Sequence, residues 1–201
     1  MYFRNRSRSR QTGFTLVELL VTIVLTGIMM AAIFVFFKSS LFNYLGLQKS
    51  ASNFTNLAAQ SQRIGSVVRG TTDLIDVQND SLQMYAYFYP TDQYVSIIKY
   101  YLDSTNTVLL ADVTPMSANP PIGAPITASK KTYTIIPSFK KVTGVNLFEY
   151  VNSANTVLTP PVSDLRTIRT IRINLSAETA TNSVTQSIKL EVNLRNRKTN
   201  L

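Results

Sequence analysis

The 201-residue sequence contains no cysteine and no histidine. Their absence excludes disulfide bonds, zinc sites of the Cys/His type, Cys–His nucleophile pairs and histidine acid–base catalysis. The sequence also offers no glycine-rich phosphate loop, no paired-carboxylate cleft and no nucleophile placed beside a base. We therefore predict that the protein is not an enzyme and holds no cofactor and no metal ion.

The acidic residues do not suggest a cation site either. Asp73, Asp76 and Asp80 could offer hard oxygen ligands to calcium, but their spacing does not match an EF-hand loop. We predict instead that they are helix-end and turn residues.

Positive charge is concentrated at the N-terminus. The chain carries 20 Lys and Arg against 11 Asp and Glu, a net charge of +9. The first 13 residues contain no acid and four arginines, which are Arg4, Arg6, Arg8 and Arg10. Without them 16 basic side chains face 11 acidic ones, a balance of +5. This mild excess does not demand a nucleic-acid partner.

A long apolar run follows the arginines. Residues 14–37 form a 24-residue stretch whose interruptions are Thr15, Glu18, Thr22, Thr26 and Gly27. As a helix it would span roughly 36 Å, enough to cross a hydrocarbon core of ~30 Å. The preceding arginines predict a cytoplasmic N-terminus and a single membrane pass. A cleaved secretory peptide usually has a shorter apolar region, so we expect this segment to stay attached to the head.

Glu18 is the only charged residue between Gln11 and Phe37. A carboxylate at the centre of a membrane helix costs roughly 2.5–3.5 kcal/mol, and less toward the interface. A simple anchor has no reason to carry it. The chemistry of the surrounding residues must therefore explain it.

Glu18 lies in the octet Gly13-Phe14-Thr15-Leu16-Val17-Glu18-Leu19-Leu20, which resembles the processing motif of type IV prepilins and pseudopilins. The resemblance implies that a prepilin peptidase cuts after Gly13 and methylates Phe14. It also implies that Glu18 pairs with the N-terminal amine of a neighbouring subunit. The alternative is a plain signal-anchor helix, unrelated to filaments, with no processing at Gly13.

The resemblance also implies partners and a location. The partners would be prepilin peptidase, other pilin or pseudopilin subunits of a hetero-oligomeric filament, an inner-membrane assembly platform and, before assembly, membrane lipid. The head would lie in the periplasm or outside the cell, beyond a single pass through the cytoplasmic membrane.

Helical spacing continues beyond the apolar run. One apolar stripe contains Phe54, Leu57, Ala58, Ile64 and Val68, with Ser61 inside it. Gly70 then supplies a stop signal. We predict one helix from about Thr15 to Arg69, with Gly27 marking either close helix–helix packing or a site where the helix loosens during assembly.

Period-two patterns beyond residue 70 predict strands at 82–89, 94–102, 107–110, 132–136, 145–151, 167–175 and 184–194. Asn152–Asn155 is a predicted hairpin turn, and 111–131 and 159–164 are predicted irregular loops. The fold class is therefore α+β, a long helix packed on an antiparallel head. The predicted parts are a leader (1–13), a membrane helix (14–38), its amphipathic continuation (39–70) and the head (71–201).

The head also resembles PilW-type minor pilins and J-type pseudopilins of type II secretion. The resemblance rests on Phe148-Glu149-Tyr150, on the arginine-bearing segment 165–175 and on the chain end at 192–197. It implies a minor pilin or pseudopilin of a type IV pilus-like or type II secretion-like filament. A major pilin remains the alternative.

Two further patterns in the head have a structural and a functional interpretation. The basic residues Lys130, Lys131, Lys140, Lys141, Arg166, Arg169 and Arg172 are either solvated surface or a DNA- or anion-binding patch for competence or adhesion. The arginines are three apart, so on a strand they cannot form one row. The tyrosines between Tyr85 and Tyr101 are predicted to be core and cross-strand residues rather than a ligand platform.

Overall fold

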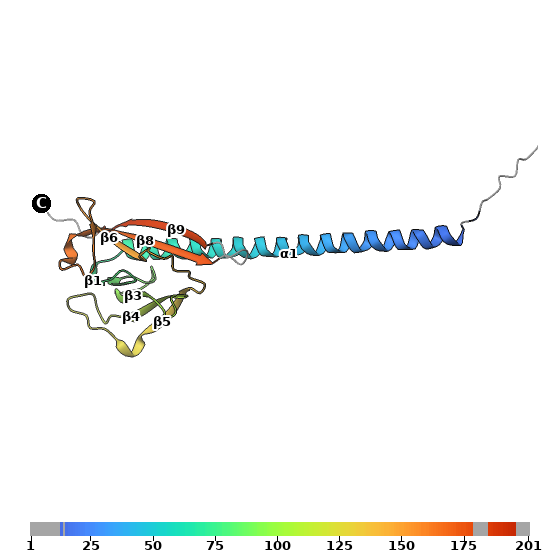
Figure 1. Ribbon diagram of the computed structural model, residues 1–201. Coiled ribbons are helices and arrows are strands. Elements are labelled where there is room, and N and C mark those ends of the chain that lie inside the picture. The colour runs from blue at the N-terminus through green and yellow to red at the C-terminus, as the bar shows by residue number, and fades with distance from the viewer. Residues whose placement is uncertain (1–12, 14, 179–184, 196–201) are drawn as a thin grey trace, which may run out of the picture. The chain divides into compact units, whose positions relative to one another are not determined.

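The computed structural model describes residue 13, residues 15–178 and residues 185–195 (Figure 1). The chain divides into two compact units, Met1–Gly46 and Leu47–Leu201. Helix α1 (Leu16–Arg69) contributes to both. Its bounds confirm the predicted helix, which ends before Gly70 as the stop signal indicated.

In the first unit, α1 is the one secondary-structure element among the described residues, and its apolar side chains are exposed. From Leu16 to Phe37 no described residue is buried. α1 is the one helix of the described chain that is long and apolar enough to cross a membrane. The 22 residues from Leu16 to Phe37 would span about 33 Å.

In the second unit, one stripe of α1 is buried in the head. The buried positions are Leu57, Ser61, Ile64, Gly65, Val67 and Val68. They confirm most of the predicted stripe. The prediction was wrong for Phe54, because its side chain is 45% exposed.

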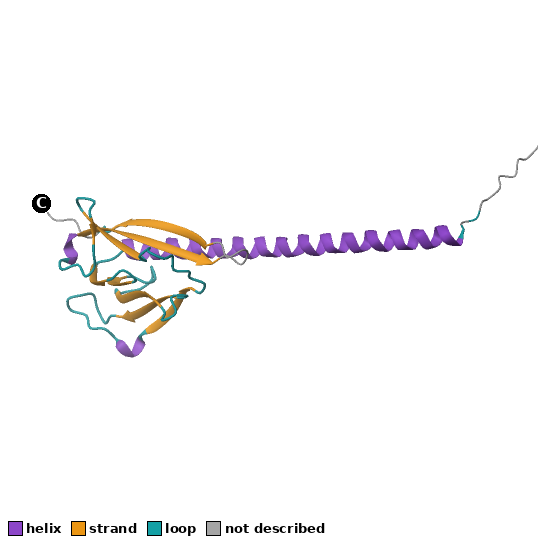
Figure 2. Ribbon diagram, viewed as in Figure 1, coloured by secondary structure: helices purple, strands orange, loops and turns teal. Residues whose placement is uncertain are grey.

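The first sheet of the head is an antiparallel meander in the order β1-β2-β3-β4-β5 (Figure 2). Its strands are β1 (Asp73–Val77), β2 (Ser81–Ala86), β3 (Ser96–Leu102), β4 (Leu109–Pro115) and β5 (Lys131–Ile136). Buried side chains alternate with less buried ones along β2, β3 and β4. One face of this sheet therefore belongs to the core.

The second sheet has the order β7-β6-β8-β9 and is also antiparallel. Its strands are β6 (Phe148–Asn152), β7 (Val157–Leu158), β8 (Ile168–Glu178) and β9 (Thr185–Asn193). The β6–β7 turn has Asn155 at φ 60°, and the Asn152 side chain accepts hydrogen bonds from the N–H groups of Ala154 and Thr156. The predicted hairpin turn is thus confirmed, with asparagine in the roles that suit it.

The last turns of α1 and both sheets share one hydrophobic core. Figure 1 shows β9 alongside α1, and a Cβ added to Gly65 would lie 3.8 Å from Val192 on that strand. The two sheets are also joined by hydrogen bonds to the β1–β2 turn. The Tyr150 hydroxyl donates to the Gln78 carbonyl at 2.8 Å, and the Phe148 N–H donates to the Asn79 carbonyl at 2.9 Å.

Two predictions about the head were wrong. Asp73 and Asp76 are in strand β1, not in a turn, and only Asp80 follows the strand. The predicted loop 111–131 begins inside β4, which continues to Pro115, and contains the short 3₁₀ helix η1 (Thr127–Ser129). Sequence patterns missed β1 and the second half of β4 because Asp and Pro are strand breakers, whereas cross-strand pairing outweighs that preference here.

Candidate processing and assembly site

The start of α1 is fixed by hydrogen bonds from Thr15. The Thr15 hydroxyl accepts a hydrogen bond from the Glu18 N–H at 3.3 Å, and its carbonyl accepts one from the Leu19 N–H at 3.2 Å. Thr15 is therefore the N-cap of the helix. The Thr22 hydroxyl donates to the Glu18 carbonyl at 2.7 Å and so satisfies its own donor within the helix.

Glu18 is the third residue of α1 and the acid of its first turn. Thr15-Leu16-Val17-Glu18 is thus a capping-box sequence, in which an acid or amide three residues after the cap supports the helix start. A negative charge in the first turn also interacts favourably with the helix dipole. This local role was missed from the sequence, although the T-x-x-E spacing was a sufficient signal for it.

Gly13 has no structural reason to be glycine. A Cβ built on it would meet no atom within 4 Å, and its φ is not in the left-handed region. The fold of the described residues therefore accepts any side chain at this position. Any requirement for glycine at position 13 therefore comes from outside the folded chain. Phe14 and the arginines of the predicted leader (Arg4, Arg6, Arg8 and Arg10) lie outside the described residues.

Gly27 lies inside α1 and is also unconstrained. A Cβ at this position would have no neighbour within 4 Å. Glycine inside a helix costs about 1 kcal/mol relative to alanine, and here no packing within the described chain explains it. Both interpretations of Gly27, close helix–helix packing and loosening of the helix, would explain this glycine by the assembly of subunits and not by the fold of the chain.

The first predicted lysine pair does not form a patch. Lys130 pairs with the Asp112 carboxylate at 2.7 Å, and that carboxylate also accepts hydrogen bonds from Thr132 and Tyr101. Partial burial works against ionisation of Asp112, but the hydrogen bonds from Lys130 and Thr132 outweigh it and lower the carboxyl pKa. Lys131 lies opposite Val113 in the next strand, a residue of the core face, and takes no part in this network.

The second lysine pair is likewise engaged by acids. Lys140 lies 3.7 Å from Glu178, and Lys141 lies 2.5 Å from Asp80. Lys131 begins β5, whereas Lys140 and Lys141 come after that strand and lie beside β8, where the Lys140 N–H donates to the Ser176 carbonyl. The structure therefore does not bring the four lysines together.

The arginine series is divided between two elements. Arg166 is in the 3₁₀ helix η2 (Leu165–Thr167), whereas Arg169 and Arg172 are on β8. Arg172 donates to Glu191 at 3.0 Å across the β8–β9 pair. This arrangement is the cross-strand pairing expected of a structural surface.

The tyrosines are divided as well. Tyr100 is buried in the core, and burial raises its pKa well above the ordinary value. Tyr85 and Tyr101 lie on strands with cross-strand partners. Tyr87, Tyr89 and Tyr94 contradict the prediction, because they lie outside the strands and are 37–42% exposed.

Comparison with known families identifies the N-terminal segment. Residues 8–34 match the family model of the prokaryotic N-terminal methylation motif, a type IV pilin-type signal. No curated protein matches the chain. The matched motif, which extends into the exposed apolar part of α1, supports a membrane-anchored, type IV pilin-like protein that prepilin peptidase processes and that assembles with other pilin subunits. The matched signal is typical of structural pilin-type subunits.

Proposed function

We propose that the chain is a minor pilin or pseudopilin, a structural subunit of a type IV pilus-like or type II secretion-like filament. One observation carries the proposal: the methylation motif at residues 8–34 opens a helix whose apolar surface nothing in the described chain covers. Apolar side chains exposed along the helix from Leu16 to Leu47 would need lipid or neighbouring helices around them.

Processing and register depend on three residues in this account. Prepilin peptidase cuts after Gly13, and Phe14 becomes the methylated N-terminus. Glu18 then lies about one helical turn from the new amine. In a staggered bundle, the carboxylate of one subunit meets the amine of the next. Leaving either charge unpaired in an apolar bundle is costly, so this pair selects one axial register.

The proposed parts of the chain lie in order from the cytoplasm, through the membrane, to the outside. Residues 1–13 are the leader, 14–38 the membrane and assembly helix, 39–70 its amphipathic continuation and 71–201 the head. The arginines of the leader hold the N-terminus in the cytoplasm, so the head is periplasmic or extracellular. The assembly platform in the inner membrane and other subunits are the partners.

A minor rather than a major subunit is proposed because the head is large and elaborate for a repeating subunit. Abundance relative to other motif-bearing subunits separates the two roles. Nucleic acid is not proposed as a partner. Three of the four candidate lysines are already paired with carboxylates, and DNA binding needs several free cations on one surface.

Photo-crosslinking tests the filament assignment directly. Benzoylphenylalanine replaces Phe34, whose side chain is 68% exposed on α1. Irradiation of cells should then produce adducts with proteins that carry the same methylation motif, identified by mass spectrometry. These adducts should disappear when a Gly13→Val change blocks processing.

The matched control places the same probe at Phe88, which is 3% exposed within the head core. It should give no adducts with other subunits. Adducts with lipid alone at position 34, with and without an active peptidase, would mean that α1 is only an anchor and would reject the filament assignment.

A further inference from the structure

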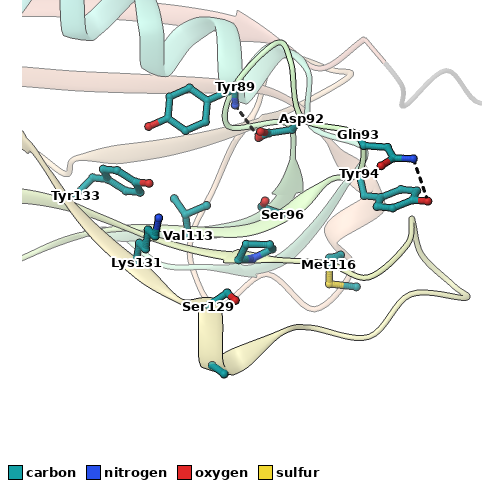
Figure 3. A pocket seen from close by; sticks show the side chains of 12 residues that line it. Tyr89, Asp92, Gln93, Tyr94, Ser96, Val113, Met116, Ser129, Lys131 and Tyr133 are labelled. Carbon is teal, nitrogen blue, oxygen red and sulfur yellow. Dashed lines mark hydrogen bonds between the residues drawn. The ribbon is translucent and has the colours of Figure 1, made fainter.

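The face of the first sheet that carries the buried residues also contains a groove of about 540 Å³, and no residue of α1 lines it. Ser96 on β3, Val113 and Pro115 on β4, and Lys131 and Tyr133 on β5 lie in register on one face and form its floor. The loop between β2 and β3 and the helix η1 form its walls (Figure 3). Its volume is typical of sites for small molecules.

At one corner of this groove, Tyr89 of the wall meets Tyr133 of the floor, and both rings are held in place from behind. The Tyr89 and Tyr133 rings meet at 80°, with centroids 6.4 Å apart, and both contact the buried Phe88 ring at 4.9 Å. The Arg63 guanidinium on α1 lies 4.5 Å from the Phe88 centroid and 5.4 Å from that of Tyr89. Asp92 accepts a hydrogen bond from the Tyr89 N–H at 2.9 Å. A wall fixed in this way loses little freedom when a ligand binds.

Among the described residues that line the groove there is one charge of each sign. Lys131 is the basic residue, and it forms no ion pair with any described residue. Asp92 is the acidic residue; the Tyr89 N–H bonds one of its oxygens without removing its charge, and the other oxygen can accept a hydrogen bond from a ligand hydroxyl. Lys131 on β5 is therefore the one point at which the groove can bind an anionic group. One cation suits a single carboxylate, whereas a nucleic-acid strand requires several.

The rest of the lining combines flat rings with hydroxyl and amide groups. Figure 3 shows Tyr133 and Lys131 on one side and Gln93 and Tyr94 on the other. Ser96 and Ser129 add hydroxyls. Sugar rings match this surface, because their C–H faces pack on the electron-rich faces of aromatic rings. Their hydroxyls exchange hydrogen bonds with tyrosine, serine and glutamine.

We propose that this groove binds an acidic saccharide, with a sugar ring packed in the corner of Tyr89 and Tyr133 and its carboxylate at Lys131. The proposal requires neither cleavage at Gly13 nor entry into a filament. A purely apolar ligand is disfavoured because it would strip water from Lys131 without replacing its interactions. The proposal therefore adds a binding activity to the head.

A glycan array tests the proposal with the full chain, kept in micelles of a detergent that contains no sugar. The array carries saccharides that end in uronic acids, in sialic acids and in neutral hexoses. The chain should be retained on acid-terminated saccharides. Lys131→Met should weaken that retention about tenfold, the effect of losing one charged contact. Tyr94→Ala should weaken it severalfold by removing part of the wall.

The adjacent lysine provides the matched control. Lys130 is engaged by Asp112 and does not line the groove, so Lys130→Met should leave retention unchanged. Retention on no saccharide would overturn the proposal, as would equal loss in the Lys130 and Lys131 variants. Benzoylphenylalanine in place of Tyr94 provides a second measurement: if it crosslinks to another pilin-type subunit and no saccharide is retained, the groove is a protein interface and the proposal is overturned. None of these outcomes changes the result expected at Gly13.

Discussion

The first part of α1 and the head treat their apolar side chains in opposite ways. Between Leu16 and Leu47 the large apolar side chains are 46–79% exposed, whereas those of the head core are 0–7% exposed. The head sequence encodes its own core. The first part of the helix encodes only a helix and depends on its surroundings for burial. The exposed part of the helix therefore needs lipid or neighbouring helices to cover it, whereas the head needs neither.

The sharpest test of this difference is Glu18→Gln. Glutamine preserves the capping box but carries no charge. We expect α1 to form normally and incorporation into filaments to fall by on the order of a hundredfold or more, because the neighbouring amine loses its buried partner. Sheared filaments and membranes, analysed by quantitative mass spectrometry, give the ratio. Normal incorporation would mean that capping is the whole role of Glu18.

The second largest effect is expected when isoleucine is replaced by alanine in each of the two regions. Ile171 in β8 is 0% exposed and Ile28 in α1 is 63% exposed. Ile171→Ala should lower the free energy of unfolding of the head by about 2–5 kcal/mol. Ile28→Ala should change it by less than about 0.5 kcal/mol. Chemical unfolding in detergent, followed by the near-ultraviolet dichroism of the tyrosines, measures both. Equal losses would contradict the division into two regions.

A smaller effect is expected at the junction of the two sheets. Tyr150→Phe removes the hydrogen bonds from its hydroxyl to the carbonyls of Gln78 and Ser81, at 2.8 and 3.3 Å. The unfolding free energy should fall by about 1–2 kcal/mol. Chemical unfolding in detergent measures this loss, and an unchanged unfolding free energy would mean that the hydroxyl does not join the two sheets.

The smallest expected effect is a pH dependence from Asp112. Its pKa is lowered in the folded state, so it stabilises the head above the unfolded value of about 4 and stops doing so as the pH falls through the folded value. Asp112→Asn should cost about 1 kcal/mol or less at pH 7 and progressively less toward pH 3. Unfolding midpoints across this range test the trend. In a chain that already carries Lys130→Met, the loss of unfolding free energy caused by Asp112→Asn should be smaller.

Much of the fold follows from local patterns. Hydropathy and Gly70 bounded α1 to within a residue, and period two located β2, β3, β5, β8 and β9. β1 was missed because it is short and contains Asp73 and Asp76, and only its pairing with β2 makes it a strand. The candidate site divides in the same way. The charge anomaly of Glu18 was visible in the sequence, whereas the separation of Lys130 from Lys131 depends on which side of the sheet each one reaches.

The one sequence signal for the groove was the tyrosine-rich segment, which was assigned to the core. The aromatic corner of Tyr89 and Tyr133 is backed by Phe88 and Arg63, and these residues are brought together from α1, the β2–β3 loop and β5. Local patterns of alternation or spacing do not encode tertiary contacts of this kind. Residues that act within one helical turn could be predicted, and residues that meet through the tertiary fold could not.

The mass of the N-terminal peptide, taken from the protein in its own cells, shows whether the chain is processed as a prepilin. We predict a peptide that begins at N-methylated Phe14 when prepilin peptidase is present and at the uncut leader when the peptidase is deleted. A chain that keeps its leader in the presence of active peptidase would contradict it. The exposed helix would then be a membrane anchor, and its match to the methylation motif would carry no assembly function.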